Sequence, residues 1–248
     1  MSIYESLLAS LKSKGAAYFV LVDPDKILDE NISEFASTAQ QAGVDAFLVG
    51  GSLVVDDSFE RCIELLKKHS SLPVIIFPGS VMQISRNADA ILFLSVISGR
   101  NPQYLIGDHV ASAPTIKKIG LEPISTAYML VESGQTTSVE FMSNTRPLPS
   151  NKPDIAVAHA LAAEFLGFKM IYLEAGSGAQ NSVPEEMIGA VKKYSSVPLI
   201  VGGGITSPEI ARKKVLAGAN FIVTGNVLEK SGNAMLMKEF ADAIHNSK

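Results

Sequence analysis

Three apolar segments of the sequence end in glycine-rich stretches that could bind a phosphate. They are residues 172–178 (Tyr-Leu-Glu-Ala-Gly-Ser-Gly), 201–205 (Val-Gly-Gly-Gly-Ile) and 223–226 (Val-Thr-Gly-Asn). Glycine leaves the backbone amides open to an anion, because it has no side chain to block the approach. Tight turns between strands and helices would also explain such glycines. Only the first stretch carries an acid, Glu174, so the three together indicate a phosphate-binding enzyme with one base.

Glu174 ends an otherwise apolar segment, so its carboxylate should be partly desolvated and its pKa sensitive to the surroundings. Such a group suits a general base that acts on a hydroxyl next to a phosphate site. A structural glutamate paired with a lysine is the alternative. Tyr172 lies two residues earlier and therefore on the same face of a strand, where it could position a substrate or fill the core.

Asp23, Asp25 and Lys26 follow the first apolar segment and place two carboxylates and an ammonium together. Mg²⁺ is typically held by one or two carboxylates, with waters and substrate phosphates completing its shell. Ser52 follows the glycine pair at the end of the next apolar segment and is the expected hydroxyl ligand. Asp25 could instead be a helix cap and Lys26 a surface charge, which leaves Asp23 and Ser52 as the expected Mg²⁺ ligands.

The sequence lacks the motifs that are typical of several other kinds of chemistry. The net charge of −4 provides no basic surface for a nucleic acid. Neither a Gly-x-Ser-x-Gly elbow nor a Gly-x-Gly-x-x-Gly after the first strand is present, which disfavours serine hydrolases and NAD-dependent enzymes. A zinc site is not expected either, because the four histidines form no pair at ligand spacing: His69, His109, His159 and His245.

The chain of 248 residues, 47% of them hydrophobic, is long enough for one large core. The single cysteine, Cys62, falls in an amphipathic pattern and is expected to pack a helix. Residues 1–11 resemble a short amphipathic helix more than a secretory signal. No apolar run approaches the roughly 20 residues that span a bilayer. We therefore expect a single-domain, soluble protein of the cytoplasm.

Short apolar runs alternate with helical patterns along the whole chain. The expected strands are residues 18–22, 46–49, 74–77, 90–94, 122–127, 170–173, 199–201 and 221–223. The expected helices are residues 33–42, 59–69, 102–119, 155–166, 184–194, 208–217 and 233–245. Eight strand-then-helix units predict an α/β fold, the (β/α)₈ or TIM barrel.

Two segments depart from this repeat. Residues 78–89 have room for only a short helix or an irregular loop, and residues 131–153 form a long polar insertion after the fifth strand. Long loops inside compact barrels are usually lids or binding loops, although a solvent-exposed loop is the alternative.

The barrel places its active site at the carboxyl ends of the strands. The residues expected there are Asp23, Asp25, Gly50, Gly51, Ser52, Pro78, Gly79, Ser80, Ser95, Tyr128, residues 174–178, residues 202–204, Gly225 and Asn226.

Taken together, these motifs are recognisable. Residues 22–26, 49–52, 77–79, 172–179, 200–205 and 224–226 resemble geranylgeranylglyceryl phosphate synthases, in order and at compatible spacing. Residues 100–109 and 151–155 are similar to the longer-chain branch of that family, found in archaea and some bacteria. The resemblance implies an ether-lipid biosynthetic enzyme that transfers a geranylgeranyl group from its diphosphate to the C3 hydroxyl of sn-glycerol 1-phosphate, releasing diphosphate.

The same resemblance implies a set of binding residues. Asp23 and Ser52 match the ligands of the Mg²⁺ cofactor. The residues that match the glycerol phosphate site are Tyr172, Leu173, Glu174, Ala175, Gly176, Ser177, Gly178, Gly203, Gly204, Gly225 and Asn226. A homo-oligomer, a dimer or a hexamer, is implied as well, with transient contact at a membrane surface for product release.

A mechanism follows as a hypothesis. Mg²⁺ on Asp23 and Ser52 would stabilise the leaving diphosphate, while Glu174 takes the proton of the attacking hydroxyl. The C20 tail needs an apolar trough, which we expect near residues 78–89. The shorter-chain branch has a lysine where this chain has Leu21, so that phosphate contact does not transfer.

Two other classes of function remain possible from the sequence. A sugar-phosphate isomerase or epimerase would use the same glycine loops without a prenyl donor. A phosphate-binding scaffold would bind a ligand without turnover, which the acid beside the glycines argues against. Donor chain length stays open between C20 and longer prenyl groups.

Overall fold

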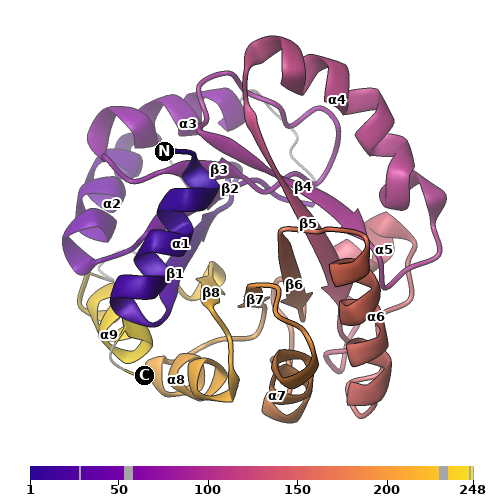
Figure 1. The fold of residues 1–248 in the computed structure, drawn as a ribbon. Coiled ribbons are helices and arrows are strands. Elements are labelled where there is room, and N and C mark those ends of the chain that lie inside the picture. Colours follow the sequence, from indigo (N-terminus) through magenta and orange to yellow (C-terminus); the bar gives the residue numbers. More distant parts are fainter. Residues whose placement is uncertain (28, 53–57, 229–233, 246, 248) are drawn as a thin grey trace.

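Eight parallel strands close into a barrel and helices surround it, as the alternating pattern predicts (Figure 1). This computed structural model describes residues 1–27, 29–52, 58–228, 234–245 and 247. The strands run in chain order around the barrel, and β1 pairs with both β2 and β8. Their bounds are β1 Ala17–Val22, β2 Ala46–Val49, β3 Val74–Ile76, β4 Ala90–Val96, β5 Glu122–Leu130, β6 Met170–Glu174, β7 Leu199–Gly202 and β8 Phe221–Thr224.

All eight predicted strands form, and the differences lie at their ends. Strand β5 continues three residues beyond its predicted end, and β4 two residues beyond, so that Ser95 and Tyr128 lie within strands rather than after them. These two strands pair over seven residues, from Ala90 with Glu122 to Val96 with Tyr128. The backbone pairing of β4 with β5 extends both strands, and no local sequence pattern reveals that pairing.

The helices are α1 Ile3–Lys14, α2 Asp29–Ala42, α3 Ser58–His69, α4 Asp108–Ile119, α5 Ser138–Ser143, α6 Pro153–Phe165, α7 Glu185–Tyr194, α8 Pro208–Ala217 and α9 Ala234–His245. The predicted end helix began at Asn233, which lies outside the described residues. Cys62 is buried in α3, as expected, and burial, together with Asp29 and Asp23, raises its pKa to about 12.

The single helix predicted over residues 102–119 forms without a break, but residues 103–107 are π-helical. A π-helical turn, η1 (Gln103–Gly107), precedes α4. The Ser95 hydroxyl donates to the Leu105 carbonyl at 2.8 Å, which attaches η1 to the end of β4. Residues 78–89 contain no helix or strand, consistent with an irregular loop.

Side chains alternate between the barrel interior and the layer under the helices. Interior positions carry large groups such as Phe19 and Phe221, whose rings stack at 4.9 Å. Helix α1 lies across one end of the barrel (Figure 1), and its Leu7 packs with this interior cluster. The Glu122 carboxylate accepts the amides of Ile3 and Tyr4 at the start of α1, which attaches the helix to β5.

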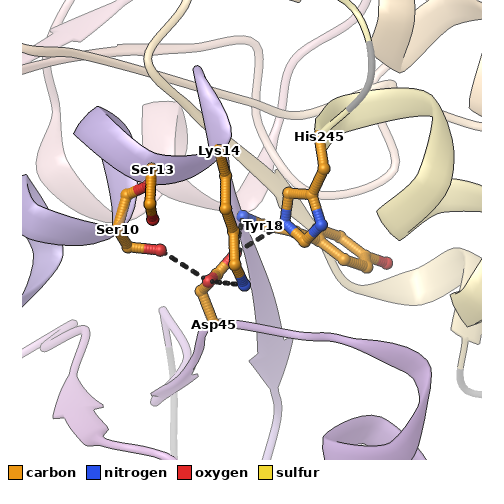
Figure 2. A network of polar contacts seen from close by, with 6 residues as sticks. All are labelled: Ser10, Ser13, Lys14, Tyr18, Asp45 and His245. Carbon is orange, nitrogen blue, oxygen red and sulfur yellow. Dashed lines mark hydrogen bonds and ion pairs between the residues drawn. The ribbon is translucent and has the colours of Figure 1, made fainter.

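Asp45, just before β2, ties together segments from both ends of the chain (Figure 2). Its carboxylate accepts hydrogen bonds from Ser10 and Lys14 of α1, from the backbone amide of Tyr18, and pairs with His245 of α9 at 2.8 Å. Burial alone would raise the pKa of Asp45, but these donors outweigh it and lower the pKa to about 2. The network therefore fastens α1 and α9 to the barrel.

None of the helices described here has the length and apolar character needed to cross a membrane.

Candidate active site

A cavity of about 1020 Å³ opens at the carboxyl ends of the strands. One part of its wall is polar and comes from the ends of β1, β2, β6, β7 and β8. The other part is apolar and comes from the 78–89 loop, β4, η1 and α5. The polar residues include Asp23, Lys26, Ser52, Glu174, Ser177 and Asn226, and the apolar ones include Phe77, Ile84, Phe93, Tyr104, Val139 and Met142.

Glu174 is the last residue of β6, and its side chain is only 5% exposed. Its Oε1 accepts the amide of Gly176 at 2.6 Å. Burial raises the pKa of this carboxyl to about 7, although the Gly176 amide and Tyr172 oppose part of the rise. Among the described residues no lysine or arginine forms an ion pair with it, so the lysine partner of the structural alternative is not found there.

Aromatic rings surround this acid within the barrel. Tyr172 stacks on Phe77 with ring centres 5.4 Å apart, and Tyr128 lies 5.4 Å from Tyr172. Burial, followed by the charge of Glu174, raises the pKa of both tyrosines well above 10, so both stay neutral. The Tyr172 hydroxyl is buried without a well-aligned hydrogen bond in the described part of the chain. Tyr172 thus faces the interior as predicted, with its hydroxyl beside the Glu174 carboxylate whose pKa it lowers.

Gly203 shows why the turn after β7 needs glycine. Its φ of +80° suits glycine, and an added Cβ would lie 2.4 Å from Glu174 Oε1 and 2.6 Å from the Gly176 nitrogen. The β7 turn can therefore press directly against the β6 turn. Gly204 and Gly225 also line the cavity, as do Gly176 and Gly178. The predicted phosphate cradle is brought together from three strands.

Two predicted binding residues point elsewhere. The side chains of Leu173 and Ala175 pack in the outer core, under the helices, and do not line the cavity. The Ala175 amide is also engaged, because it donates to the Gly202 carbonyl at 3.1 Å. Alternation along β6 explains both positions, since residues next to the inward-facing Tyr172 and Glu174 must face outward.

A chain of polar contacts joins the mouths of β1, β6 and β8. Asn226 Oδ1 accepts from the Ser177 hydroxyl at 3.1 Å and lies 3.5 Å from Lys26 Nζ. Lys26 Nζ in turn lies 3.1 Å from Asp23 Oδ2. Lys26 therefore belongs to the cavity. Asp25 does not line the cavity, and its Oδ1 accepts from Ser58 at the start of α3.

Asp23 and Ser52 both line the polar wall. Gly51, next to Ser52, lies so close to Asp23 that an added Cβ would be 3.3 Å from Asp23 Oδ1. One carboxylate and one hydroxyl on a wall open to a phosphate-bearing ligand fit the sparse protein shell that Mg²⁺ accepts. Within the described ranges, no three histidine, cysteine or acidic side chains gather at a spacing that could hold a metal.

The insertion of residues 131–153 reaches this cavity. It begins with a bridge between Val131 and Leu148 and contains the short helix α5. Val139 and Met142 of α5 supply part of the apolar wall, and Tyr104 of η1 and Phe93 of β4 continue it. None of these four side chains was predicted to line the site, and only Val139 and Met142 had a signal in the sequence, as apolar residues inside an otherwise polar insertion. The insertion lies at the active-site mouth.

Comparisons with known proteins point in one direction. The sequence model of the PcrB family matches residues 10–244 of this chain. A geranylgeranylglyceryl phosphate synthase from Chitinophaga pinensis is 49% identical over 244 residues, which cover 98% of this chain and 96% of that protein. One from Thermococcus kodakarensis is 47% identical over 229 residues, covering 92% and 90%.

Solved structures give the same result for the fold. The (S)-3-O-geranylgeranylglyceryl phosphate synthase of Thermoplasma acidophilum, in complex with its substrate sn-glycerol-1-phosphate, has a TM-score of 0.94, with 33% identity and 99% of each chain covered. An N-acetylmannosamine-6-phosphate 2-epimerase of Clostridium perfringens, at 17% identity and a TM-score of 0.56, covers 94% and 95% and shares the fold alone. This chain belongs to the PcrB family.

Proposed function

We propose that this protein transfers a geranylgeranyl group from geranylgeranyl diphosphate to the C3 hydroxyl of sn-glycerol 1-phosphate. One observation carries the proposal: a buried carboxyl with a pKa near 7 lies between a glycine cradle and a long apolar cavity wall. The names of the relatives and the glycerol phosphate bound in the Thermoplasma enzyme support it.

The acceptor side of the reaction uses the turns after β6, β7 and β8. Backbone amides of the glycine cradle bind the phosphate, and Tyr172 offers its hydroxyl to the glycerol portion. Glu174, when ionised, accepts the proton of the C3 hydroxyl as that oxygen attacks C1 of the prenyl chain. The surrounding aromatic rings exclude water from this acid, which also protects the reacting carbon from hydrolysis.

The donor diphosphate belongs beside Asp23, Lys26 and Ser52. Asp23 and Ser52 would hold Mg²⁺, which neutralises the charge of the leaving diphosphate when bound. The Lys26 ammonium lies on the same wall and adds a fixed positive charge. It occupies the mouth of the same strand as Leu21, the position where the shorter-chain branch has its lysine.

The prenyl tail fits the apolar wall between the 78–89 loop and α5. Each CH₂ group that leaves water contributes about 0.8 kcal/mol, so a C20 chain gains much of its affinity here. This wall distinguishes the proposed reaction from sugar-phosphate isomerisation, in which both reacting groups are polar.

A turnover assay tests the proposal. The protein is incubated with Mg²⁺, sn-glycerol 1-phosphate and labelled geranylgeranyl diphosphate, and organic-extractable phosphate ester is measured. The expected result is label in the ester only when both substrates are present. Isomerisation of sugar phosphates with no ester formed would support the epimerase alternative, and binding without turnover would support a scaffold.

The proposed metal site is tested with Asp23→Asn. Because the amide removes the charged ligand, the Mg²⁺ concentration for half-maximal activity should rise about tenfold or more. Asp25→Asn, whose side chain contacts Ser58 outside the cavity, is the matched control and should keep the parent value. An unaltered Mg²⁺ dependence in D23N would place the metal elsewhere.

We also propose that the chain assembles as a homo-oligomer in the cytoplasm. Ile106 of η1 and Val110 of α4 are 59% and 68% exposed on neighbouring turns, which leaves an apolar surface for a second copy. Light scattering of the purified protein should give a dimer or a larger assembly, and a monomer across the micromolar range would contradict this.

A further inference from the structure

The insertion after β5 is fastened to the phosphate cradle. Gln135 Nε2 donates to the Gly178 carbonyl at 2.6 Å, and the Asn181 amide donates to the Ser133 carbonyl at 3.0 Å. Backbone hydrogen bonds of Leu148 with Leu130 and Glu132 hold the base of the insertion on the end of β5. The segment just before α5 is thus held against the turn after β6.

Thr137, which ends this segment, carries a hydroxyl that the fold leaves unused. It occupies the position before the first residue of α5, where threonine usually caps a helix, yet its side chain makes no capping hydrogen bond. Thr137 is 5% exposed, and its Oγ1 is buried without a hydrogen-bond partner in the described ranges. A buried hydroxyl in this state is unfavourable, so a partner is expected in the working enzyme.

The surroundings of Thr137 identify that partner. Thr137 lines the active-site cavity and lies directly over Gly176, where an added Cβ would meet its Cγ2 at 2.5 Å and its Oγ1 at 2.7 Å. The Gly176 amide is bonded to the Glu174 carboxylate, so this hydroxyl is next to the proposed base. The molecule expected at this point of the cavity is the acceptor.

We propose that Thr137 binds the acceptor, with its hydroxyl hydrogen-bonded to an oxygen of sn-glycerol 1-phosphate. This inference rests on the proposed function. It makes the insertion part of the acceptor site, in addition to its contribution to the apolar wall. The alternative role for Thr137 is packing of its methyl group on Gly176.

Two substitutions separate these roles. Thr137→Val keeps the shape and the methyl contact but removes the hydroxyl, whereas Thr137→Ser keeps the hydroxyl and removes the methyl. Thr115→Val is the matched control, because Thr115 is exposed on α4 and does not line the cavity. Binding of sn-glycerol 1-phosphate is measured by calorimetry without donor, and steady-state kinetics give KM for each substrate.

A hydrogen bond to a charged ligand predicts that T137V weakens binding of sn-glycerol 1-phosphate about tenfold or more. Its KM for the acceptor should rise while that for the donor stays within about threefold. T137S and T115V should bind within about threefold of the parent. Because T137V removes an unpaired buried hydroxyl, its ligand-free thermal midpoint should equal or exceed the parent value, which shows that the variant folds.

The opposite pattern would overturn the inference: T137V binds like the parent while T137S binds weakly. That result would assign Thr137 to packing and leave the proposed function intact, because the parent would still bind and convert the acceptor. A parent chain that neither binds nor converts sn-glycerol 1-phosphate would overturn both proposals.

Discussion

At the scale of a single residue, the proposed chemistry depends on Glu174 as the general base. The alternation of side chains along β6 directs Glu174 into the barrel interior. Burial raises its pKa to about 7, and the Gly176 amide, 2.6 Å from its Oε1, fixes its orientation. A carboxyl with this pKa is partly ionised at neutral pH and is still basic enough to accept a hydroxyl proton. The nearby tyrosines cannot take this role, since their pKa values are raised well above 10.

The pH dependence of the reaction should therefore report on Glu174. The ionised form is the active base, so kcat/KM for the acceptor should fall as the pH drops through about 7 and reach a plateau above it. Glu174→Gln should lack this inflection. Initial rates between pH 4 and pH 8.5 test the prediction, and an inflection near pH 4.5 would contradict the effect of burial.

At the scale of secondary-structure elements, we expect the loops that follow the strands to supply substrate selectivity. The irregular 78–89 loop and α5 both contribute to the apolar wall, while the turns after β6, β7 and β8 contribute to the polar wall. Both loop segments stand out in the sequence as departures from the strand–helix repeat. Their side-chain contacts do not, because Val139 and Ile84 become neighbours of one cavity only after the barrel closes.

Ile84 and Met82 provide a matched pair within the 78–89 loop. Ile84 is half-buried in the cavity wall, whereas Met82 is 84% exposed and does not line the cavity. Ile84→Ala removes apolar contact worth about 1–2 kcal/mol, so KM for geranylgeranyl diphosphate should rise about fivefold to thirtyfold. Met82→Ala should leave it unchanged. Equal effects of the two substitutions on the donor KM would place the tail elsewhere.

At the scale of the whole molecule, the Asp45 network closes the fold. It joins α1 and α9, near the two ends of the sequence, through Asp45, which is 200 residues from its partner His245 (Figure 2). The side chain of Asp45 is 6% exposed, so solvent screens these contacts little.

Asp45→Asn should destabilise the protein by about 2 kcal/mol at pH 7, since the carboxyl pKa falls from 3.8 to about 2 on folding. A lowered pKa gives stability that is present above pH 4 and lost as the pH falls towards 2. The difference between parent and variant in urea unfolding should therefore shrink between pH 4 and pH 2. A difference that grows on acidification would contradict this assignment.

The sequence predicted the barrel and most of the site because both depend on local patterns. Buried parallel strands appear in the sequence as continuous apolar runs, and the position of active sites at strand ends predicts that Asp23, Glu174 and Gly203 lie together. Contacts between residues far apart in the sequence could not be predicted from local patterns. The Thr137 contact with Gly176 and the Asp45 network each depend on residues far apart in sequence.

The central claim is that Glu174 removes the proton of a held acceptor, and Glu174→Gln tests it most directly. The amide keeps the size of the side chain but cannot act as the base. Calorimetry should show sn-glycerol 1-phosphate binding within about threefold of the parent, while single-turnover ester formation at pH 8 falls about 100-fold or more. A single-turnover rate equal to that of the parent would contradict the claim.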